Sequence, residues 1–465
     1  MKPQRALRAW RALVSFCLGV IVSGAAGAAP GIIIIDGMRA GTGAGPTDAY
    51  CQSFGYLCYS PQQMRKAYGL DRLIDGGFVG AGQTIVIIDS YGSPTIAEDL
   101  HQFDIGYGLP DPPSFTVLAP LGSVPWNPTL YPDQPGWGGE TTLDVEWAHA
   151  MAPGASIVLL TSPVDETEGV QGLPQFLQLE QYALEHHLGH IISQSWSATE
   201  NTLFTSVSGP QGPQIVAQFE QFYSRAIAQN VTVLAAAGDT GSSNVELDGV
   251  TYYPFPTVGY PASSPQVTAV GGTTLYADAA GHYQYETVWN DSIFTSPDYY
   301  LAAAGAGGIS QIFAEPFYER TSLPPHVQRE LGGMRGLPDV SYNADCNNFI
   351  WIYASFPGSG GPGYQGICGT SEGSPQWAGI VADLNQYAGH PLGFLNPSLY
   401  AAGASGQFAL FGRDITIGNN ALVNTPGASA PGYAATPGWD LASGWGSPNL
   451  ISLPGREWNW PIGGQ

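Results

Sequence analysis

Ser371 lies where a serine side chain could act as a nucleophile. It follows Gly369 and Thr370 in the segment Cys-Gly-Thr-Ser-Glu-Gly-Ser-Pro, and Pro375 comes near the first turn of an expected amphipathic helix. Proline is tolerated there because the N–H group that it lacks would have no helical partner. A hydroxyl at a helix N-terminus can attack a carbonyl carbon while backbone N–H groups stabilise the developing oxyanion. An ordinary serine helix cap has the same sequence pattern, so this segment alone leaves both interpretations open.

Glu140 and Asp144 are the candidates for a general base and a proton relay. They are four residues apart, so on a helix they share one face. Two carboxyl groups at that separation raise each other's proton affinity, and one can accept a proton while the other holds or relays it. His149 is nine residues beyond Glu140 and should point away from that face. The alternative interpretation is a solvated acidic helix start that the helix dipole stabilises.

Asp239 lies in the segment Ala-Gly-Asp-Thr-Gly-Ser, which by itself resembles the signature of a pepsin-like aspartic protease. That fold needs a second such aspartate, and the Asp-Ser pairs that begin at Asp89 and Asp291 lack the following glycine. The segment around Ser371 also matches the nucleophile elbow of α/β-hydrolases, which requires an acid and then a histidine further on. Only His390 follows, and the intervening acid and strands have no room. Both interpretations are therefore rejected.

Alternating strands and helices should position these side chains. Apolar, β-branched runs typical of buried strands cover residues 84–89, 156–160, 190–193, 231–235 and 267–270. Helical segments cover residues 61–68, 96–103, 141–151, 174–187 and 213–229. This order predicts one α/β core with a mostly parallel central sheet flanked by helices, followed by long loops. Ligands then bind at the carboxyl ends of strands, where Asp89, Ser195, Trp196 and Asp239 are expected.

The N-terminal residues predict export. Residues 1–28 combine a basic head, an apolar core and a small-residue cleavage site, which is the pattern of a signal peptide, although an uncleaved anchor is an alternative. Residues 29–59 are expected to form an extended or loosely ordered N-terminal extension, and residues 60–465 the catalytic domain. No later apolar run is long enough to cross a bilayer. We therefore expect a secreted or extracellular protein, or a periplasmic one, with no membrane contact beyond the signal peptide.

The amino-acid composition indicates which partners and which cellular compartment are compatible with the chain. The chain has 14 Lys and Arg against 37 Asp and Glu, a formal charge of -23, which argues against nucleic-acid binding. That balance suits an acidic environment, in which protonated carboxyl groups repel one another less. Beyond the signal peptide, four cysteines form two local pairs, Cys51 with Cys58 and Cys346 with Cys368. An even number in an exported chain suggests two disulfides, although four cysteines allow three pairings.

From about residue 61 to residue 450 the chain resembles the sedolisins, the serine-carboxyl peptidases with a subtilisin-like fold. The resemblance rests on Gly-Thr-Ser-x-x-x-Pro-x-x-Ala-Gly around Ser371, on the acidic pair Glu140 and Asp144, and on Asp239 in Ala-Gly-Asp-Thr-Gly. It implies that Ser371 is the nucleophile, Glu140 its base and Asp144 the partner of that base. It also implies that Asp239 stabilises the oxyanion. A carboxylate base works in acid, where a histidine would be protonated. By position, Asp89 and Trp196 are expected to support the same network.

The resemblance further implies one structural calcium ion in a C-terminal loop. Two aspartates and three backbone carbonyls would supply the hard oxygen ligands that calcium prefers, and the residues are Asp414, Ile415, Thr436, Gly438 and Asp440. An ordinary Gly/Pro turn with incidental aspartates is the alternative. Family members usually carry a large folded propeptide, whereas only about thirty residues separate the expected cleavage site from the catalytic domain. A full-size propeptide is therefore not expected.

The sequence thus predicts a secreted, acid-active serine-type endopeptidase that cleaves protein or peptide substrates through an acyl-enzyme on Ser371, working as a monomer. Three alternatives stay open. One is a tripeptidyl aminopeptidase of the same family, and another is a catalytically silent exported binding protein on the same fold. The third is a subtilisin active near neutral pH, for which Asp89 would fit the acid, although Glu140 stands where the histidine should be.

Overall fold

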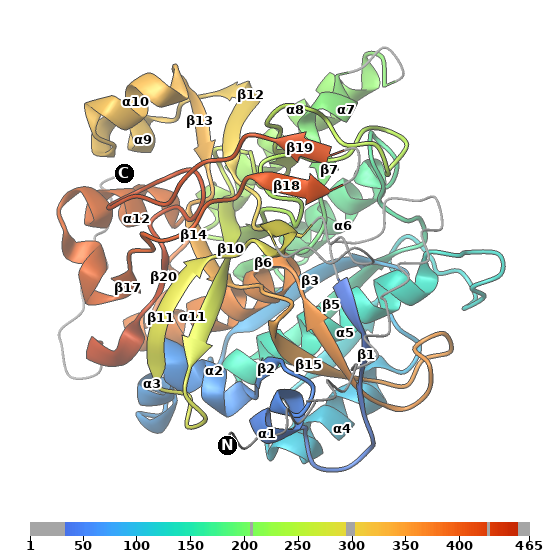
Figure 1. Cartoon of the computed structure of the whole chain (residues 1–465). Coiled ribbons are helices and arrows are strands. Elements are labelled where there is room, and N and C mark those ends of the chain that lie inside the picture. The colour runs from blue at the N-terminus through green and yellow to red at the C-terminus, as the bar shows by residue number, and fades with distance from the viewer. Residues whose placement is uncertain (1–32, 205–207, 294–302, 426–427, 454–465) are drawn as a thin grey trace, which may run out of the picture.

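The computed structural model describes residues 33–204, 208–293, 303–425 and 428–453, and a mostly parallel sheet lies at its centre (Figure 1). Its strands, in the order in which they lie side by side, are β11 (Tyr283–Val288), β10 (Thr268–Ala277), β8 (Thr232–Ala236), β6 (Ile191–Gln194), β3 (Thr84–Ser90), β5 (Ser156–Ser162) and β4 (Phe115–Leu118), with β14 (Val340–Asn343) paired to β10. All neighbours are parallel except β10 and β11. The predicted α/β fold is confirmed.

Helices cover both faces of this sheet. The α-helices are α1 (Asp48–Gln52), α2 (Pro61–Tyr68), α3 (Asp71–Asp75), α4 (Ile96–Tyr107), α5 (Gln134–Met151), α6 (Leu173–Glu185), α7 (Glu200–Leu203), α8 (Gln211–Ala228), α9 (Phe317–Ser322), α10 (Pro325–Leu331), α11 (Gly373–Ala388) and α12 (Asn396–Ala404). α5 and α11 pack on each other and on one face, while α6 and α8 pack on the other. Strand β3 shows why both faces are covered, because Ile85 and Ile87 enter one core and Val86 and Ile88 the other.

Helix α5 begins seven residues earlier than the sequence predicted, at residue 134 instead of 141. Its first turns contain Pro135 and several glycines, which weaken the helical pattern in the sequence. Packing explains why the helix forms there. A Cβ atom on Gly138 would lie 2.8 Å from Trp126 and 3.2 Å from Phe356. The glycine therefore lets α5 approach these rings, and Glu140 lies inside the helix rather than at its start.

A second sheet contains part of the N-terminal extension, which we expected to be extended or loosely ordered, and the extended alternative describes β1. Its strand order is β1 (Ile33–Ala40), β16 (Gly363–Cys368), β15 (Asn348–Ala354) and β2 (Leu57–Tyr59). β1 pairs antiparallel with β16, and the register shifts between Ile34 and Arg39. That irregularity removes the two-residue period by which a strand is recognised in sequence.

The rest of the chain forms small elements around this core. They are the 3₁₀ helices η1 (Asp291–Ile293), η2 (Thr370–Glu372), η3 (Gln407–Leu410) and η4 (Leu450–Ser452), and the strands β7 (Ala198–Thr199), β9 (Gly259–Tyr260), β12 (Gly308–Ala314), β13 (Met334–Leu337), β17 (Gly412–Arg413), β18 (Leu422–Thr425), β19 (Ala428–Ala430) and β20 (Ser447–Pro448). None of the helices in the described ranges has the length and apolar character needed to span a bilayer. The predicted signal peptide, residues 1–28, lies outside the described residues.

Candidate active site

Ser371 lies in a short turn between a strand and a helix. β16 ends at Cys368, Gly369 follows with φ 125°, and Ser371 is the middle residue of η2, directly before α11. A side chain at residue 369 would strain this backbone, which is why the turn requires glycine. Ser371 is 1 % exposed, and its Oγ has no hydrogen-bond partner among the described residues. The hydroxyl is thus held at a helix start without being used as a cap.

Glu140 and Asp144 project from α5 and are both fully buried. Burial raises the pKa of Glu140 well above its usual range, the charge of Asp89 raises it further, and the Ser371 hydroxyl lowers it. The serine therefore faces this carboxyl group, although neither Glu140 oxygen forms a well-aligned hydrogen bond with a described residue. Asp144 accepts a 2.8 Å hydrogen bond at Oδ1 from Ser195 Oγ, just beyond β6. Burial and the charge of Asp89 also raise the pKa of Asp144.

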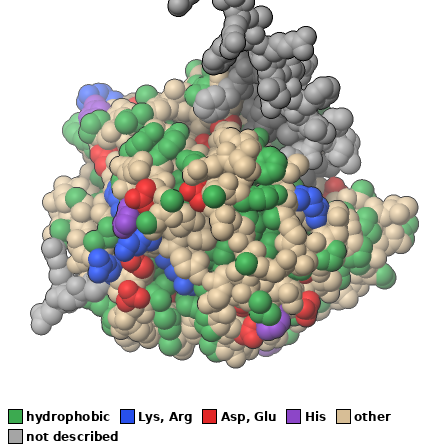
Figure 2. All heavy atoms as spheres, turned by 60° about the horizontal axis from the view of Figure 1, so that its bottom comes forward, with side chains coloured by type: hydrophobic (Ala, Val, Ile, Leu, Met, Phe, Trp, Pro, Cys, Tyr) green, Lys and Arg blue, Asp and Glu red, His purple; other side chains and the backbone are tan. Residues whose placement is uncertain are grey.

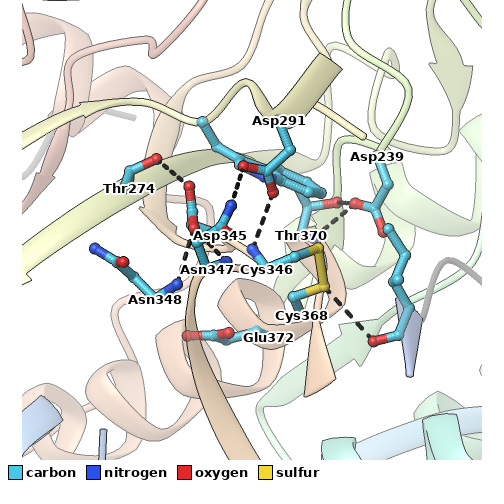
Figure 3. Close-up of a disulfide and its surroundings, with 12 residues drawn as sticks. Asp239, Thr274, Asp291, Asp345, Cys346, Asn347, Asn348, Cys368, Thr370 and Glu372 are labelled. Atoms are coloured by element: carbon cyan, nitrogen blue, oxygen red, sulfur yellow. Dashed lines mark hydrogen bonds between the residues drawn. A yellow bond between two sulfur atoms is a disulfide. The ribbon is translucent and has the colours of Figure 1, made fainter. Parts of the chain in front are cut away.

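Asp239 lies beyond the end of β8 and reaches the same turn. Its Oδ1 accepts hydrogen bonds from Thr370 N at 2.6 Å and Thr370 Oγ1 at 2.7 Å, as the sticks in Figure 3 show. Its Oδ2 is buried and has no partner among the described residues. Burial raises the pKa of Asp239 to about 7, so below that pH the carboxyl group is neutral. A protonated Oδ2 next to Ser371 can donate a hydrogen bond to an oxyanion.

Asp89 lies close to the two carboxyl groups of α5, Glu140 and Asp144, and Trp196 packs against a neighbouring ring. Asp89 is fully buried at the end of β3, and burial raises its pKa to about 7, against a smaller opposing effect of the Thr141 hydroxyl. The Trp196 ring packs against Phe176, with ring centroids 4.9 Å apart. Its Nε1 has no hydrogen-bond partner among the described residues. The structure thus brings Asp89, Glu140 and Asp144 together and leaves the Trp196 indole outside their hydrogen bonding.

His149 points away from the site, as its helical position predicted. Its Nε2 lies 2.7 Å from the backbone oxygen of Pro110 and 3.3 Å from Asp104 Oδ1 in α4. The opposite faces of α5 therefore carry different chemistry, and no histidine stands next to Ser371 in the described hydrogen-bond network.

Thr370 is a site residue that the sequence did not indicate, whereas Ser195 is expected at the carboxyl end of a strand but without a role there. Thr370 connects Asp239 to the turn of Ser371, because its Oγ1 also accepts a hydrogen bond from Gly238 N at 3.0 Å. Ser195 fixes one oxygen of Asp144. Serine and threonine are too common for either to stand out alone, although Ser195 comes directly after a predicted strand, where site residues are expected.

Both expected disulfides are present. Cys51 pairs with Cys58, and Cys346 pairs with Cys368, which is the last residue of β16. The second bridge ties the strand that leads to Ser371 to the segment between β14 and β15 (Figure 3). The pairing is the local one that the spacing of the cysteines suggested.

The residues expected to bind calcium lie together in the C-terminal loop. Asp414 Oδ2 accepts a 2.8 Å hydrogen bond from Gly438 N, and Asp440 Oδ2 accepts one of 2.8 Å from Thr436 N. Ser443 Oγ lies 3.1 Å from Asp440 Oδ1 and 3.4 Å from the Ile415 backbone oxygen. In the described part of the chain, no three His, Cys, Asp or Glu side chains are grouped for a metal ion, so carbonyl oxygens must complete any site here. These all-oxygen donors fit calcium.

Comparison with known proteins identifies the class that this fold and site define. The subtilase family model matches residues 139–401, which is more than half of the 465 residues. The structure of Pseudomonas sedolisin, a serine-carboxyl proteinase solved with pseudo-iodotyrostatin, is similar to this one with a TM-score of 0.67 and 29% sequence identity, over 86% of this chain and 97% of that one. The chain therefore belongs to the subtilase family and, within it, to the sedolisins.

Curated relatives agree with this assignment. Kumamolisin of Bacillus sp. (strain MN-32) is 35% identical over 88% of this chain, and sedolisin of Pseudomonas sp. (strain 101) is 31% identical over 80%. Tripeptidyl-peptidase 1 of Mus musculus is 27% identical over 68%. The matched regions span 65%, 57% and 51% of these relatives' own lengths. The activity, the substrates and the partners of this chain are therefore matters of proposal.

Proposed function

We propose that this protein is an exported, acid-active serine-carboxyl endopeptidase with Ser371 as its nucleophile. One observation carries the proposal. Ser371 has a free hydroxyl that faces the buried Glu140 carboxyl group, and next to it Thr370 holds Asp239 with one oxygen unpartnered. Their burial and their closeness to one another support the roles of nucleophile for Ser371, base for Glu140 and oxyanion donor for Asp239.

The proposed reaction begins when Ser371 Oγ attacks the scissile carbonyl carbon and Glu140 accepts its proton. The carbonyl oxygen becomes an oxyanion, to which protonated Asp239 donates a hydrogen bond. The C–N bond then breaks, and Glu140 returns the proton to the leaving amine. Water, deprotonated by Glu140, attacks the acyl-enzyme, and the product acid and free Ser371 form.

A raised pKa does not prevent Glu140 from acting as a base in acid. The charge of Asp89 raises the pKa of Glu140 and of Asp144, and the charge of Glu140 raises that of Asp144, so the three titrate as a group. The raised pKa values favour the protonated form of all three groups, so in this proposal Glu140 accepts the proton in the fraction of molecules in which one of the three carboxyl groups is ionised. In this proposal Asp144, which Ser195 holds by a hydrogen bond, orients Glu140. The other carboxyl groups of the three keep their protons until the pH rises.

The test is hydrolysis of a denatured protein between pH 2 and pH 8 by the folded protein. We expect a maximum in acid, and Ser371→Ala should lower kcat by about 10⁴-fold or more. Activity confined to neutral pH would favour the subtilisin alternative. A folded wild-type protein without turnover at any pH would leave the binding-protein alternative.

A different substrate is needed to distinguish an endopeptidase from a tripeptidyl aminopeptidase. Tripeptidyl-peptidase 1 among the relatives favours the second mode. A peptide with an acetylated N-terminus can be cut only by an enzyme that does not need a free amine. We expect internal cleavage of this peptide, and release of tripeptides only from free N-termini would contradict the endopeptidase mode.

We further propose export, a monomer and one structural calcium ion. Two disulfides support an oxidising compartment, and the formal charge of -23 disfavours nucleic acid as a partner. Asp414 and Asp440, with the carbonyl oxygens of Ile415, Thr436 and Gly438, would hold the ion and so fix the C-terminal loop.

Chelation tests the calcium site. Removal of calcium should lower Tm by several degrees, because an ion that binds only the folded state stabilises it by mass action. Added calcium should restore Tm, whereas Asp440→Asn should lower Tm and make it insensitive to chelation. An unchanged Tm in the wild type after chelation would refute the site.

A further inference from the structure

Glu372, the residue after Ser371, carries a buried carboxyl group that the proposed reaction does not use. Its side chain is fully buried. One oxygen, Oε1, accepts a 2.9 Å hydrogen bond from Asn343 Nδ2, and the other, Oε2, has no partner among the described residues. A buried ionised carboxylate with one oxygen unsatisfied is costly, so this geometry favours the neutral acid.

Asn343 is itself firmly placed. Its Nδ2 also donates to the Asn348 backbone oxygen at 2.8 Å, and its Oδ1 accepts from Leu275 N at 2.9 Å. It is the last residue of β14, which pairs with β10 in the central sheet. The bond from Asn343 to Glu372 therefore ties the turn of Ser371 to the sheet.

Among the described residues, the surroundings of Glu372 contain carboxyl, phenol and amide groups but no cation that pairs with it. The charges of Asp345 and Asp239 raise its pKa, and its own charge raises the pKa of Tyr342 and Tyr68. Burial raises the pKa of Glu372 well above its usual range, the charge of Asp345 adds to this, and the hydrogen bonds of Asn343 and of the Gln376 side chain offset it only in part. No Lys or Arg side chain in the described ranges forms an ion pair with this carboxyl group.

Asp345 and Asp291 extend this acidic region along the Cys346–Cys368 disulfide. Asn347 links the two aspartates, since its N donates to Asp345 Oδ1 at 2.6 Å and its Nδ2 to Asp291 Oδ1 at 2.7 Å. Figure 3 shows them on one side of the disulfide, with Glu372 below it and Asp239 on the other side. Burial and the charge of Asp345 raise the pKa of Asp291 to about 8. A negative charge on Glu372 would thus enter a region of carboxyl groups without a compensating cation.

We propose that Glu372 is a positioning residue for Ser371. While neutral and buried it holds the turn next to Asn343, and its ionisation places an uncompensated charge among buried carboxyl groups, which opens the turn to water although Asn343 Nδ2 can still donate to the carboxylate. The inference rests on the proposed function in one respect, namely that Ser371 is the nucleophile. It assigns to the activity of this chain an upper pH limit that is separate from the titration of Glu140, Asp144, Asp89 and Asp239.

Glu372→Gln tests the inference, because the amide keeps the acceptor for Asn343 and cannot ionise. The readouts are the pH dependence of kcat and the hydrogen exchange of the amides of Gly369, Thr370 and Glu372, which are hydrogen-bonded in the structure. We expect the wild type to lose kcat and protection together as the pH rises. In Glu372→Gln the pH at which half of kcat is lost and the pH at which half of the amide protection is lost should both rise by about one unit or more, which is a tenfold change in proton concentration.

Glu372→Ala provides the complementary variant. It removes the bond to Asn343 at every pH, so protection of the three amides and kcat should be low already in acid, with KM little changed. The glutamine variant should restore both. Equal alkaline midpoints in wild type and Glu372→Gln would overturn the inference.

Glu180→Gln is the matched control. Glu180 is also fully buried, one oxygen contacts the Gln194 side chain, and the other has no partner in the described chain. Glu180 lies in α6 on the other face of the sheet. The Glu180→Gln variant should therefore alter the pH dependence of Tm and leave hydrogen exchange at the amides of Gly369, Thr370 and Glu372 unchanged. If a folded wild type has no turnover at all, the proposed function fails, while exchange at these amides still decides whether Glu372 holds the turn.

Discussion

At the scale of single residues, Asp239 shows how one carboxyl group can have two tasks. Oδ1 accepts two hydrogen bonds from Thr370 and so fixes the group next to Ser371, while Oδ2 stays free. The first task needs an acceptor, and the second needs a donor. A neutral carboxylic acid supplies both, and so does an amide.

Asp239→Ala should therefore lower kcat by about 10²–10³-fold, the usual cost of losing one oxyanion donor. Asp239→Asn should recover much of this loss, because the amide oxygen can accept from Thr370 while Nδ2 donates. Steady-state kinetics at the acid optimum, with Tm as a check on folding, measure the effect. An asparagine variant as inactive as the alanine variant would show that Asp239 does not act as a donor.

The chemistry of single residues was predictable only where a motif carried it. Ser371, Glu140, Asp144 and Asp239 lie at recognisable spacings, and the structure brings them together. Their roles remain predictions until turnover is measured. Glu372 was not predicted, because its environment comes from Asn343 and Asp345, on distant segments that no local spacing connects to it.

At the scale of elements, the close contact of α5 and α11 sets the distance between Glu140 and Ser371. Gly379 of α11 lies at this contact. A Cβ atom there would be 2.5 Å from Met151 Cβ and 2.9 Å from the backbone oxygen of Ala148. The two helices can approach this closely only because residue 379 has no side chain.

Gly379→Ala should force α5 and α11 apart. We expect a loss of about 1–3 kcal/mol in the free energy of unfolding, which is typical of overpacking, and a lower kcat. Urea denaturation and kinetics test this. Gly41→Ala is the control, since a Cβ atom at residue 41 meets nothing within 4 Å, and it should leave both unchanged.

Elements were predictable where one strong local signal defined them. The helix from Pro61 to Tyr68 follows from Ser60, which caps it, and its predicted bounds agree with α2. The start of α5 and the strand β1 were missed. Packing against Trp126 and Phe356 overrides poor helix propensity in the first case, and pairing with a strand more than 300 residues away defines the second.

At the scale of the whole molecule, many carboxyl groups are inside rather than on the surface. Figure 2 shows one face on which charged side chains are sparse and stand in small groups. Carboxyl groups with 0 % exposure and a pKa raised well above the usual range by burial are Glu140, Asp144, Glu146, Glu180, Glu372 and Asp383. The described chain holds few buried cations, of which Arg335 pairs with Glu319 and Asp339.

The protein should therefore become less stable as the pH rises. For a carboxyl group whose pKa is higher in the folded state, the folded state binds more protons between the unfolded pKa, about 4, and the folded one. In that window each such group lowers the free energy of unfolding by about 1.4 kcal/mol per pH unit. Below about pH 4 the group is protonated in both states, and its stabilisation of the folded state is then fully present. Tm measured from pH 3.5 to pH 8 should fall, and a rise across this range would contradict the ionisation scheme.

The pairing of β1 with β16 has a consequence for fragment complementation. β1 is joined to the following helix α1 by residues 41–47, most of which are exposed, yet it lies along the strand whose last residue is two positions before Thr370. If that connection were cut, backbone hydrogen bonds, the packing of Ile35 and Met38 and the bonds of the Arg39 side chain to the Ser359 and Gly361 backbone oxygens would retain the strand. We then expect a peptide of residues 33–40 to bind to a chain that lacks them and to restore the second sheet.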